Sequence, residues 1–181
     1  LLARAGIPAG IRLLGVVPCS KMPSKVWPLE RFREVGSRLL QDYPDCMLVV
    51  VGGRDDTARG EELRRAWGPR ARNLAGELSP YGSAEVLRQC IAYVGNDTGA
   101  MHLAGMVGTP CVALFSARDY PGQWEPYGDG HEVLRHETDC AGCMLDVCPY
   151  NNKCLNLITV DEAMVSLKRL VVSGNRKTGR S

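Results

Sequence analysis

The chain has 181 residues, of which 45% are hydrophobic, and 22 Lys and Arg against 20 Asp and Glu give it a formal net charge of +2. This length and apolar share predict one globular domain with enough core to fold alone. The small positive charge comes partly from residues 175–181, and no basic stripe is interleaved with aromatic residues, so we expect no nucleic-acid partner. No apolar run reaches the length of a membrane span, and the first residues lack the pattern of a signal peptide.

The two ends of the chain suggest where the domain begins and ends. The sequence starts at Leu1 without a Met, and we therefore expect that an N-terminal portion precedes it. Residues 174–181 are mostly basic or small, which predicts a flexible basic tail. The folded domain is accordingly expected to span residues 1–173.

Apolar segments and amphipathic helical patterns alternate along the chain. Residues 11–17 are mostly apolar, as in a buried strand, while 28–43 carry apolar residues at helical spacing behind a Pro that suits a first helical turn. A capping-box pattern at 159–162 predicts the start of the last helix. In chain order, the predicted elements are a strand at 11–17, a helix at 28–43, a strand at 47–51, a charged helix of about ten residues ending near 67–69, a strand at 71–74, a helix at 83–90, a strand at 91–94, a helix starting near Thr98, a strand at 111–115 and a helix at 159–170.

Strands that are continuously apolar and alternate with helices favour a parallel sheet covered on both faces. The sequence therefore predicts an α/β domain with a doubly wound, Rossmann-like parallel sheet. In such sheets ligands bind beyond the carboxyl ends of the strands. Neither a G-x-G-x-x-G fingerprint nor a Walker lysine loop is present, so the common nucleotide-binding motifs are absent.

The most informative segment is 93–105, in which a short strand leads into a helix through a polar turn. Asp97 or Thr98 would cap the helix, and the first free backbone N–H groups would point outward beside them. Asp97, Thr98 and His102 would then converge within about one helical turn. This arrangement predicts a site for an anionic ligand, although Asp97 alone is also compatible with a plain cap and His102 with a structural histidine.

A second polar loop, residues 18–28, follows the first predicted strand. It contains Ser20, Lys21, Ser24 and Lys25, which could grip phosphate oxygens with hydroxyl donors and ammonium charge. Surface lysines are usually only solvated, which is the alternative interpretation. A doubly wound fold would bring this loop and the 96–99 turn to one edge of the sheet.

Four cysteines lie in a Cys-rich loop, residues 140–154: Cys140, Cys143, Cys148 and Cys154. Thiolates at such short spacings can enclose a tetrahedral zinc, but the spacing is not that of paired C-x-x-C knuckles, so reduced thiols or disulfides stay open as alternatives. The other four cysteines lie in or beside predicted strands and are interpreted as small buried hydrophobes. Unpaired core cysteines without a signal peptide favour a reducing cytoplasm.

Several motifs together resemble glycosyltransferase family 9, the ADP-heptose:lipopolysaccharide heptosyltransferases. The most specific is Gly-Asn-Asp-Thr-Gly-Ala-Met-His-Leu-Ala at 95–104, and the resemblance extends over 11–170. The other motifs are Lys-Val-Trp-Pro at 25–28, Arg-Phe at 31–32, Val-Gly-Gly at 51–53, Asn-Leu-Ala-Gly at 73–76, Gly-Thr-Pro at 108–110 and Leu-Phe at 114–115.

The resemblance implies a GT-B enzyme of two Rossmann-like domains, of which this chain is the C-terminal, donor-binding half and lacks the N-terminal acceptor domain. It implies that Ser20 and Lys25 meet the diphosphate of a nucleotide sugar, and that Asp97, Thr98, Gly99 and His102 line the pocket. Asp56 would face the nucleotide ribose and Leu78 the base. The resemblance also implies that the site uses no metal or other cofactor.

The function implied is transfer of a sugar, heptose from an ADP-linked donor, to a lipopolysaccharide core or related glycan or lipid-linked acceptor, with inversion at the anomeric carbon. The catalytic base belongs to the other domain, so this chain alone is expected to bind donor and transfer little. The full-length enzyme would work at the cytoplasmic face of the inner membrane, in peripheral association with it. The alternative is a non-catalytic nucleotide-binding or zinc-stabilised α/β module.

Overall fold

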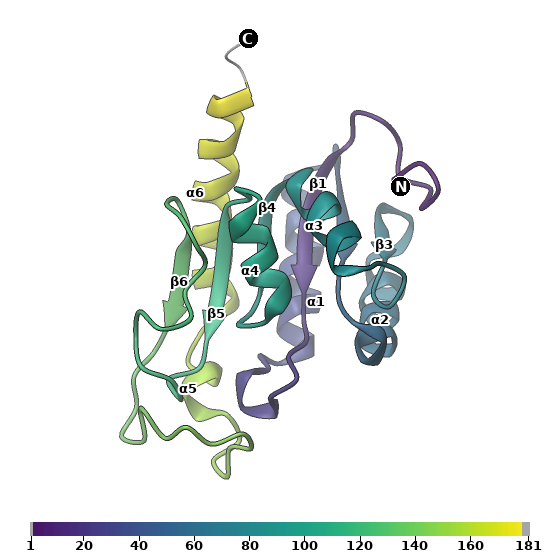
Figure 1. Ribbon diagram of the computed structural model, residues 1–181. Helices are drawn as coiled ribbons and strands as arrows, with labels where there is room; N and C mark the ends of the chain where they lie inside the picture. Colours follow the sequence, from purple (N-terminus) through teal and green to yellow (C-terminus); the bar gives the residue numbers. More distant parts are fainter. Residues whose placement is uncertain (1, 179–181) are drawn as a thin grey trace.

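The computed structural model describes residues 2–178, with side chains described for residues 2–172. Six strands form one sheet in the order β3-β2-β1-β4-β5-β6, and every neighbouring pair is parallel (Figure 1). The strands are β1 (Arg12–Val17), β2 (Cys46–Val50), β3 (Ala71–Asn73), β4 (Cys90–Asn96), β5 (Cys111–Phe115) and β6 (Glu132–Arg135). The helices are α1 (Leu29–Asp42), α2 (Thr57–Trp67), α3 (Pro80–Arg88), α4 (Gly99–Met106), α5 (Lys153–Asn156) and α6 (Val160–Thr178), with short 3-10 turns η1 (Pro23–Lys25), η2 (Arg54–Asp56) and η3 (Gly68–Arg70).

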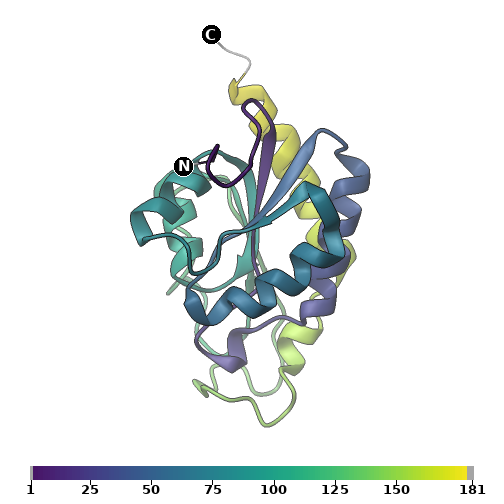
Figure 2. The ribbon, with the colours of Figure 1, turned by 90° about the vertical axis from the view of Figure 1, so that its right-hand side faces the viewer.

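The sheet is buried on both faces, because successive side chains of its strands enter two different apolar cores. In β1, Leu14 and Val16 enter one core, whereas Leu13 and Val17 enter the other. Helices α1, α2 and α6 contribute to the first core, and α3 and α4 to the second. Figure 2 shows α3 and α4 on one side of the sheet and α1 and α6 on the other. The predicted doubly wound α/β architecture is confirmed.

One glycine permits the close packing of α1 against α2. A Cβ at Gly36 would lie 2.2 Å from Cε2 of Trp67. The Trp67 indole is buried, and its Nε1 donates a hydrogen bond to the backbone oxygen of Arg33 at 2.9 Å. The position therefore requires the absence of a side chain rather than an unusual backbone conformation.

Two predicted boundaries differ from the structure at the site end of the sheet. Helix α3 begins at Pro80 instead of residue 83, because Ser79 caps it by accepting a hydrogen bond from Gly82 N at 3.1 Å. Strand β4 continues to Asn96, although residues 95 and 96 were predicted as turn. A Gly in a strand is a weak β signal, but a Cβ at Gly95 would come within 2.7 Å of the Val17 oxygen on β1.

The C-terminal half contains two elements that the sequence did not predict. Strand β6 has four residues, Glu-Val-Leu-Arg, and lies half-buried at the sheet edge, so it carries neither a continuous apolar run nor a clear alternation. Helix α5 has only four residues. Helix α6 extends to Thr178, so residues 174–178 of the expected tail are helical, and 179–181 lie outside the described residues.

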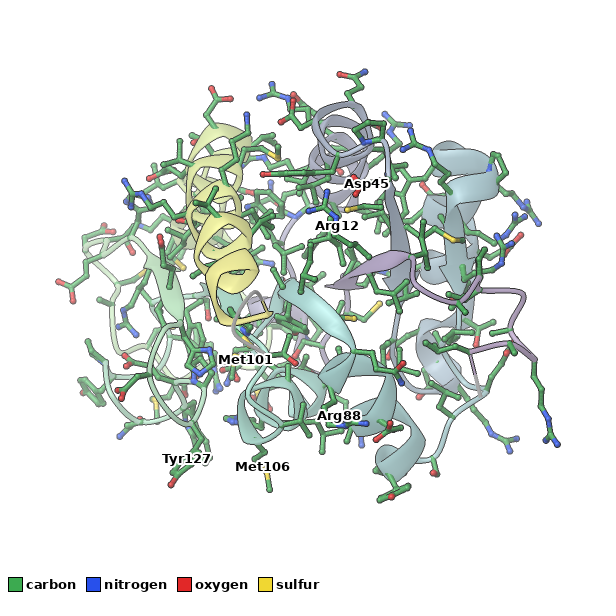
Figure 3. All side chains as sticks on the ribbon, turned by 90° about the horizontal axis from the view of Figure 1, so that it is seen from above. Arg12, Asp45, Arg88, Met101, Met106 and Tyr127 are labelled. Carbon is green, nitrogen blue, oxygen red and sulfur yellow. The ribbon has the colours of Figure 1, made fainter. Side chains whose placement is uncertain are left out.

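From β1 the chain adds strands β2 and β3 toward one edge of the sheet, and from β4 it adds β5 and β6 toward the other edge, so the strand order reverses between the central neighbours β1 and β4. Such a reversal separates the loops that leave the two strands, and a crevice opens between them at the carboxyl ends. These ends point downward in Figure 1. The opposite, amino end is seen in Figure 3, where Arg12 and Asp45 lie together in an ion pair of 2.5 Å. Among the described residues, no helix is both long enough and apolar enough to cross a membrane.

Candidate functional site

A large open cleft of about 2130 Å³ lies at the carboxyl end of the sheet. The loops after β1, β2 and β4 and the start of α3 line it. The place agrees with the crevice that the strand reversal between β1 and β4 creates. All eight residues that the family resemblance assigned to the donor site are among its lining residues: Ser20, Lys25, Asp56, Leu78, Asp97, Thr98, Gly99 and His102. Of the two other candidates in the 18–28 loop, Lys21 lines the cleft, whereas Ser24 is buried and is not among the lining residues.

The two predicted loops meet at Lys25. Its Nζ lies 2.5 Å from Oδ2 of Asp97 and 2.8 Å from Oδ2 of Asp119, and the Lys25 side chain is only 10% exposed. The ammonium thus sits between two buried carboxylates, one after β4 and one after β5. The Lys25 ammonium donates a hydrogen bond to Asp97, and its contact with Asp119 is an ion pair.

Two further hydrogen bonds fasten the loop after β1 to the end of β4. Ser20 Oγ donates to the backbone oxygen of Asp97 at 3.2 Å, and Trp27 N donates to Oδ1 of Asn96 at 3.0 Å. Trp27 is fully buried, and its Nε1 donates to the backbone oxygen of Ile158 at 3.0 Å. The loop that carries Lys25 is therefore held at both of its ends.

The start of α4 differs in one respect from the prediction for a helix capped by Asp97 or Thr98. Thr98 occupies the N-cap position in an extended conformation, but its side chain makes no capping hydrogen bond. The Asp97 carboxylate points to Lys25 instead. Gly99 is the first helical residue, and a Cβ there would have no neighbour within 4 Å, so the helix start is open on the cleft side. A helix start of this kind offers N–H groups and a positive dipole end to an anion.

The other end of the cleft is formed by the loop after β2. Asp56 Oδ2 accepts a hydrogen bond from Gly53 N at 2.8 Å and so closes the turn before α2. Asp56 therefore has a structural role in the turn besides lining the cleft. The Asp56 carboxylate also lies near Cys19: burial, together with this carboxylate, raises the pKa of the Cys19 thiol to about 12, so this cleft thiol is protonated at neutral pH.

Three residues that support the site without lining its cleft were not selected from the sequence: Asn96, Arg118 and Asp119. Asn96 is fully buried beside Asp97, and Asp119 follows β5 at the same edge of the sheet. The rule that placed Asp97 at the carboxyl end of its strand would also have placed Asp119. Its pairing with Lys25 has no local sequence signal, because the two residues are far apart in the chain.

The Cys-rich loop 140–154 packs against the cleft without forming a cluster of thiols. The described residues contain no group of three or more His, Cys, Asp or Glu side chains placed to hold a metal ion. Cys154 is buried, and its Sγ accepts a hydrogen bond from Ala117 N at 3.3 Å. Asn152 Nδ2 donates to the backbone oxygens of Pro23 at 2.8 Å and Val26 at 3.2 Å, so the loop buttresses the turn that carries Lys25.

A doubly wound sheet with a polar cleft at its strand reversal defines a Rossmann-like α/β domain. The sequence model of glycosyltransferase family 9 (heptosyltransferase) matches residues 3–154. The chain belongs to this family, which confirms the resemblance seen in the sequence motifs.

Curated relatives of the chain are lipopolysaccharide and lipooligosaccharide heptosyltransferases. Lipooligosaccharide heptosyltransferase 2 of Haemophilus influenzae is 30% identical over 129 residues, which make up 68% of this chain and 36% of that protein. Lipopolysaccharide heptosyltransferase 2 of Salmonella typhimurium is 32% identical over 111 residues, or 57% of this chain and 30% of that protein. The chain thus spans 36% and 30% of the lengths of these two relatives.

Solved structures share the fold at lower sequence identity. The structure of E. coli ADP-heptose LPS heptosyltransferase II superposes with a TM-score of 0.80 at 23% identity, covering 96% of this chain and 50% of that chain. E. coli heptosyltransferase WaaC with ADP gives a TM-score of 0.72 at 20% identity, covering 90% of this chain and 46% of that chain. The fold of this chain therefore corresponds to about half of each of those structures.

Proposed function

We propose that this chain is the donor-binding, C-terminal domain of a GT-B heptosyltransferase and that its cleft binds a nucleoside diphosphate sugar, ADP-heptose. The observation that carries the proposal is the meeting of Lys25 with Asp97 beside the open start of α4, in a chain of glycosyltransferase family 9. Relatives named as lipopolysaccharide heptosyltransferases support heptose as the sugar and the lipopolysaccharide core as the acceptor of the whole enzyme.

The chemistry follows from the charges of the cleft. When the sugar leaves the nucleoside diphosphate, negative charge grows on the departing phosphate, and fixed cations and N–H donors beside it lower the barrier. The Lys25 ammonium and the N–H groups at the start of α4 serve this purpose, so the proposed reaction needs no metal. Thr98 and His102 line the same cleft and are assigned to the donor sugar and phosphates.

The acceptor-side chemistry is assigned to a domain outside this chain. An inverting transfer is helped by a general base that deprotonates the acceptor hydroxyl, and we place this base, a carboxylate, on the N-terminal domain of the whole enzyme. This chain alone is then expected to bind donor and to transfer little. The whole enzyme is proposed to act in the cytoplasm, in peripheral association with the inner membrane where its lipid-linked acceptor lies.

Calorimetric titration of this domain with ADP, UDP and GDP tests the proposal. We expect micromolar to millimolar binding of ADP, the range expected for half of a two-domain cleft, and weaker binding by Lys25→Ala and Asp97→Ala. Lys168→Ala is the matched control, because Lys168 also pairs with a carboxylate, Asp42 at 2.9 Å, but does not line the cleft. Absence of diphosphate binding by the wild-type domain, or unchanged binding by both cleft variants, would overturn the proposal. Stoichiometric zinc without nucleotide binding would instead favour a zinc-stabilised module.

A further inference from the structure

The ammonium of Lys25 has a second carboxylate partner that the proposed function does not use. Asp119 lies four residues after the end of β5 and is 4% exposed. Its Oδ2 lies 2.8 Å from Lys25 Nζ, and its Oδ1 lies 3.2 Å from Nη1 of Arg118. Asp119 therefore joins a cation of the cleft to a cation behind the cleft.

Arg118 is itself fixed by the Cys-rich loop. Its Nε donates to the backbone oxygen of Leu145 at 2.9 Å, and its Nη2 donates to that of Met144 at 2.6 Å. Its Nη2 also lies 3.3 Å from Oδ1 of Asp146. The side chain is 8% exposed, so these contacts hold a buried guanidinium in one orientation.

The four buried charges of this network cancel, and the fifth charge, on the Asp146 carboxylate beside Arg118, is largely exposed to solvent. Lys25 and Arg118 contribute two positive charges, and Asp97 and Asp119 two negative charges, all on side chains that are at most 10% exposed. A carboxylate beside a phosphate-binding lysine has two opposite effects. Its charge repels the incoming anion, whereas its contact fixes a flexible side chain before the anion arrives, which reduces the ordering cost of binding.

We propose that Asp119 is a positioning residue for the donor diphosphate: backed by Arg118, it holds the Lys25 ammonium at the place where the phosphate binds. The inference rests on the proposed function, because it concerns the same cleft and the same ligand. Asp119 acts through Lys25 and makes no contact with the donor. Its fixing effect outweighs its repulsion of the anion, since Arg118 offsets the Asp119 charge from behind.

Two variants of Asp119 separate positioning from charge. Asp119→Asn keeps the shape and removes the negative charge, so electrostatics alone would strengthen ADP binding, whereas positioning predicts weaker binding. Asp119→Glu keeps the charge but moves the carboxylate by one methylene, so electrostatics alone predicts no change and positioning again predicts weaker binding. We expect ADP affinity to fall roughly three- to tenfold in both, the scale of ordering one rotamer-rich side chain on binding. AMP, which lacks the second phosphate, should lose less.

A double-mutant cycle and a remote control complete the experiment. In a Lys25→Met background, Asp119→Asn should have no further effect on ADP affinity, because the group that it positions is gone. Asp45→Asn removes a carboxylate paired with Arg12 at 2.5 Å at the opposite end of the sheet (Figure 3), and it should leave ADP affinity unchanged. Thermal unfolding of each variant establishes that it is folded at the titration temperature.

Each outcome decides the proposal. Equal or tighter ADP binding by folded Asp119→Asn, or a loss that persists in the Lys25→Met background, would overturn it. If the wild-type domain binds no diphosphate, the proposed function fails, and the positioning contact is then decided by NMR of the Lys25 Nζ group. A slowly exchanging ammonium signal in the wild type that disappears in Asp119→Asn supports the contact, and an unchanged signal refutes it.

Discussion

Replacing Lys25 by Met should destabilise the fold as well as weaken ligand binding, because the ammonium is the counter-charge of a buried carboxylate. The Asp97 side chain is 7% exposed, and its Oδ2 lies 2.5 Å from Lys25 Nζ. Asp119 would still have Arg118 as an ion-pair partner, whereas Asp97 would lose the ion-pair partner described for it, Lys25. Removing one partner of a buried pair costs about 3–5 kcal/mol. Small domains have a free energy of unfolding of about 5–15 kcal/mol, so Lys25→Met should still fold in water when the wild-type value lies above about 5 kcal/mol, with a much smaller margin.

Urea unfolding at neutral pH measures this loss. With a slope of about 2 kcal/mol per M, the unfolding midpoint should fall by roughly 1.5–2.5 M. The double variant Lys25→Met/Asp97→Asn removes both charges of the pair and should recover most of the loss, because no uncompensated charge stays buried. The reasoning is refuted if the single variant unfolds within about 0.5 M of the wild type, or if the double variant is no more stable than the single one.

Three further predictions concern packing, acid stability and thiol chemistry. Gly36→Ala should lower the free energy of unfolding by about 1–3 kcal/mol in urea titrations, because its Cβ would meet Trp67 at 2.2 Å; Gly99→Ala, with no neighbour within 4 Å, should not. The backbone hydrogen bond from Thr159 lowers the pKa of Glu162, so the Glu162 carboxylate stabilises the fold above its ordinary pKa of 4.5, and this stabilisation is lost as the pH falls through the lowered pKa. Glu162→Gln should therefore reduce the fall of the unfolding midpoint at acid pH, and an unchanged fall would contradict this. Iodoacetamide at mildly alkaline pH should modify the native protein at the partly exposed cysteines, Cys140, Cys143 and Cys148, as detected by mass spectrometry. Burial raises the pKa of Cys19, Cys90 and Cys111 to about 12, and modification of any of these three thiols would refute the burial argument.

Most of the fold could be predicted because its strongest signals are local. The buried strands β1, β2 and β5 are nearly continuous apolar runs, and α1 and α6 have clear helical spacing, so the strands, α1 and the start of α6 were located within a few residues. The end of α6 was not, because the helix continues to Thr178 instead of ending at residue 170. The edge strand β6 was missed because its four half-buried residues gain their strand conformation from pairing with β5. Tertiary pairing of this kind leaves no trace in a short window of sequence.

In the candidate site, too, features with a local sequence signal could be predicted, and features that depend on tertiary contacts could not. The turn at 96–99 and the Lys25 loop could be selected because each follows a predicted strand, and the doubly wound fold brings such loops together. The partner of each charge could not be read in this way. Phosphate as a ligand of Lys25 stays a prediction, but the sequence did not show that the ammonium pairs with Asp97 and Asp119, or that Asp56 accepts from a backbone N–H of its own turn. The partner of each charged side chain depends on distances to other groups in the folded structure, which a linear sequence does not give.

The bonding of Asn152 to the turn that carries Lys25 has a consequence for protein engineering. Segment 140–154 has little regular secondary structure, yet the Asn152 side-chain amide donates hydrogen bonds to the backbone oxygens of both Pro23 and Val26. A graft from another family member would have to bring an equivalent amide, or the recipient turn would lose its external brace. Shortening the segment is thus expected to weaken the proposed nucleotide binding before it changes the central sheet.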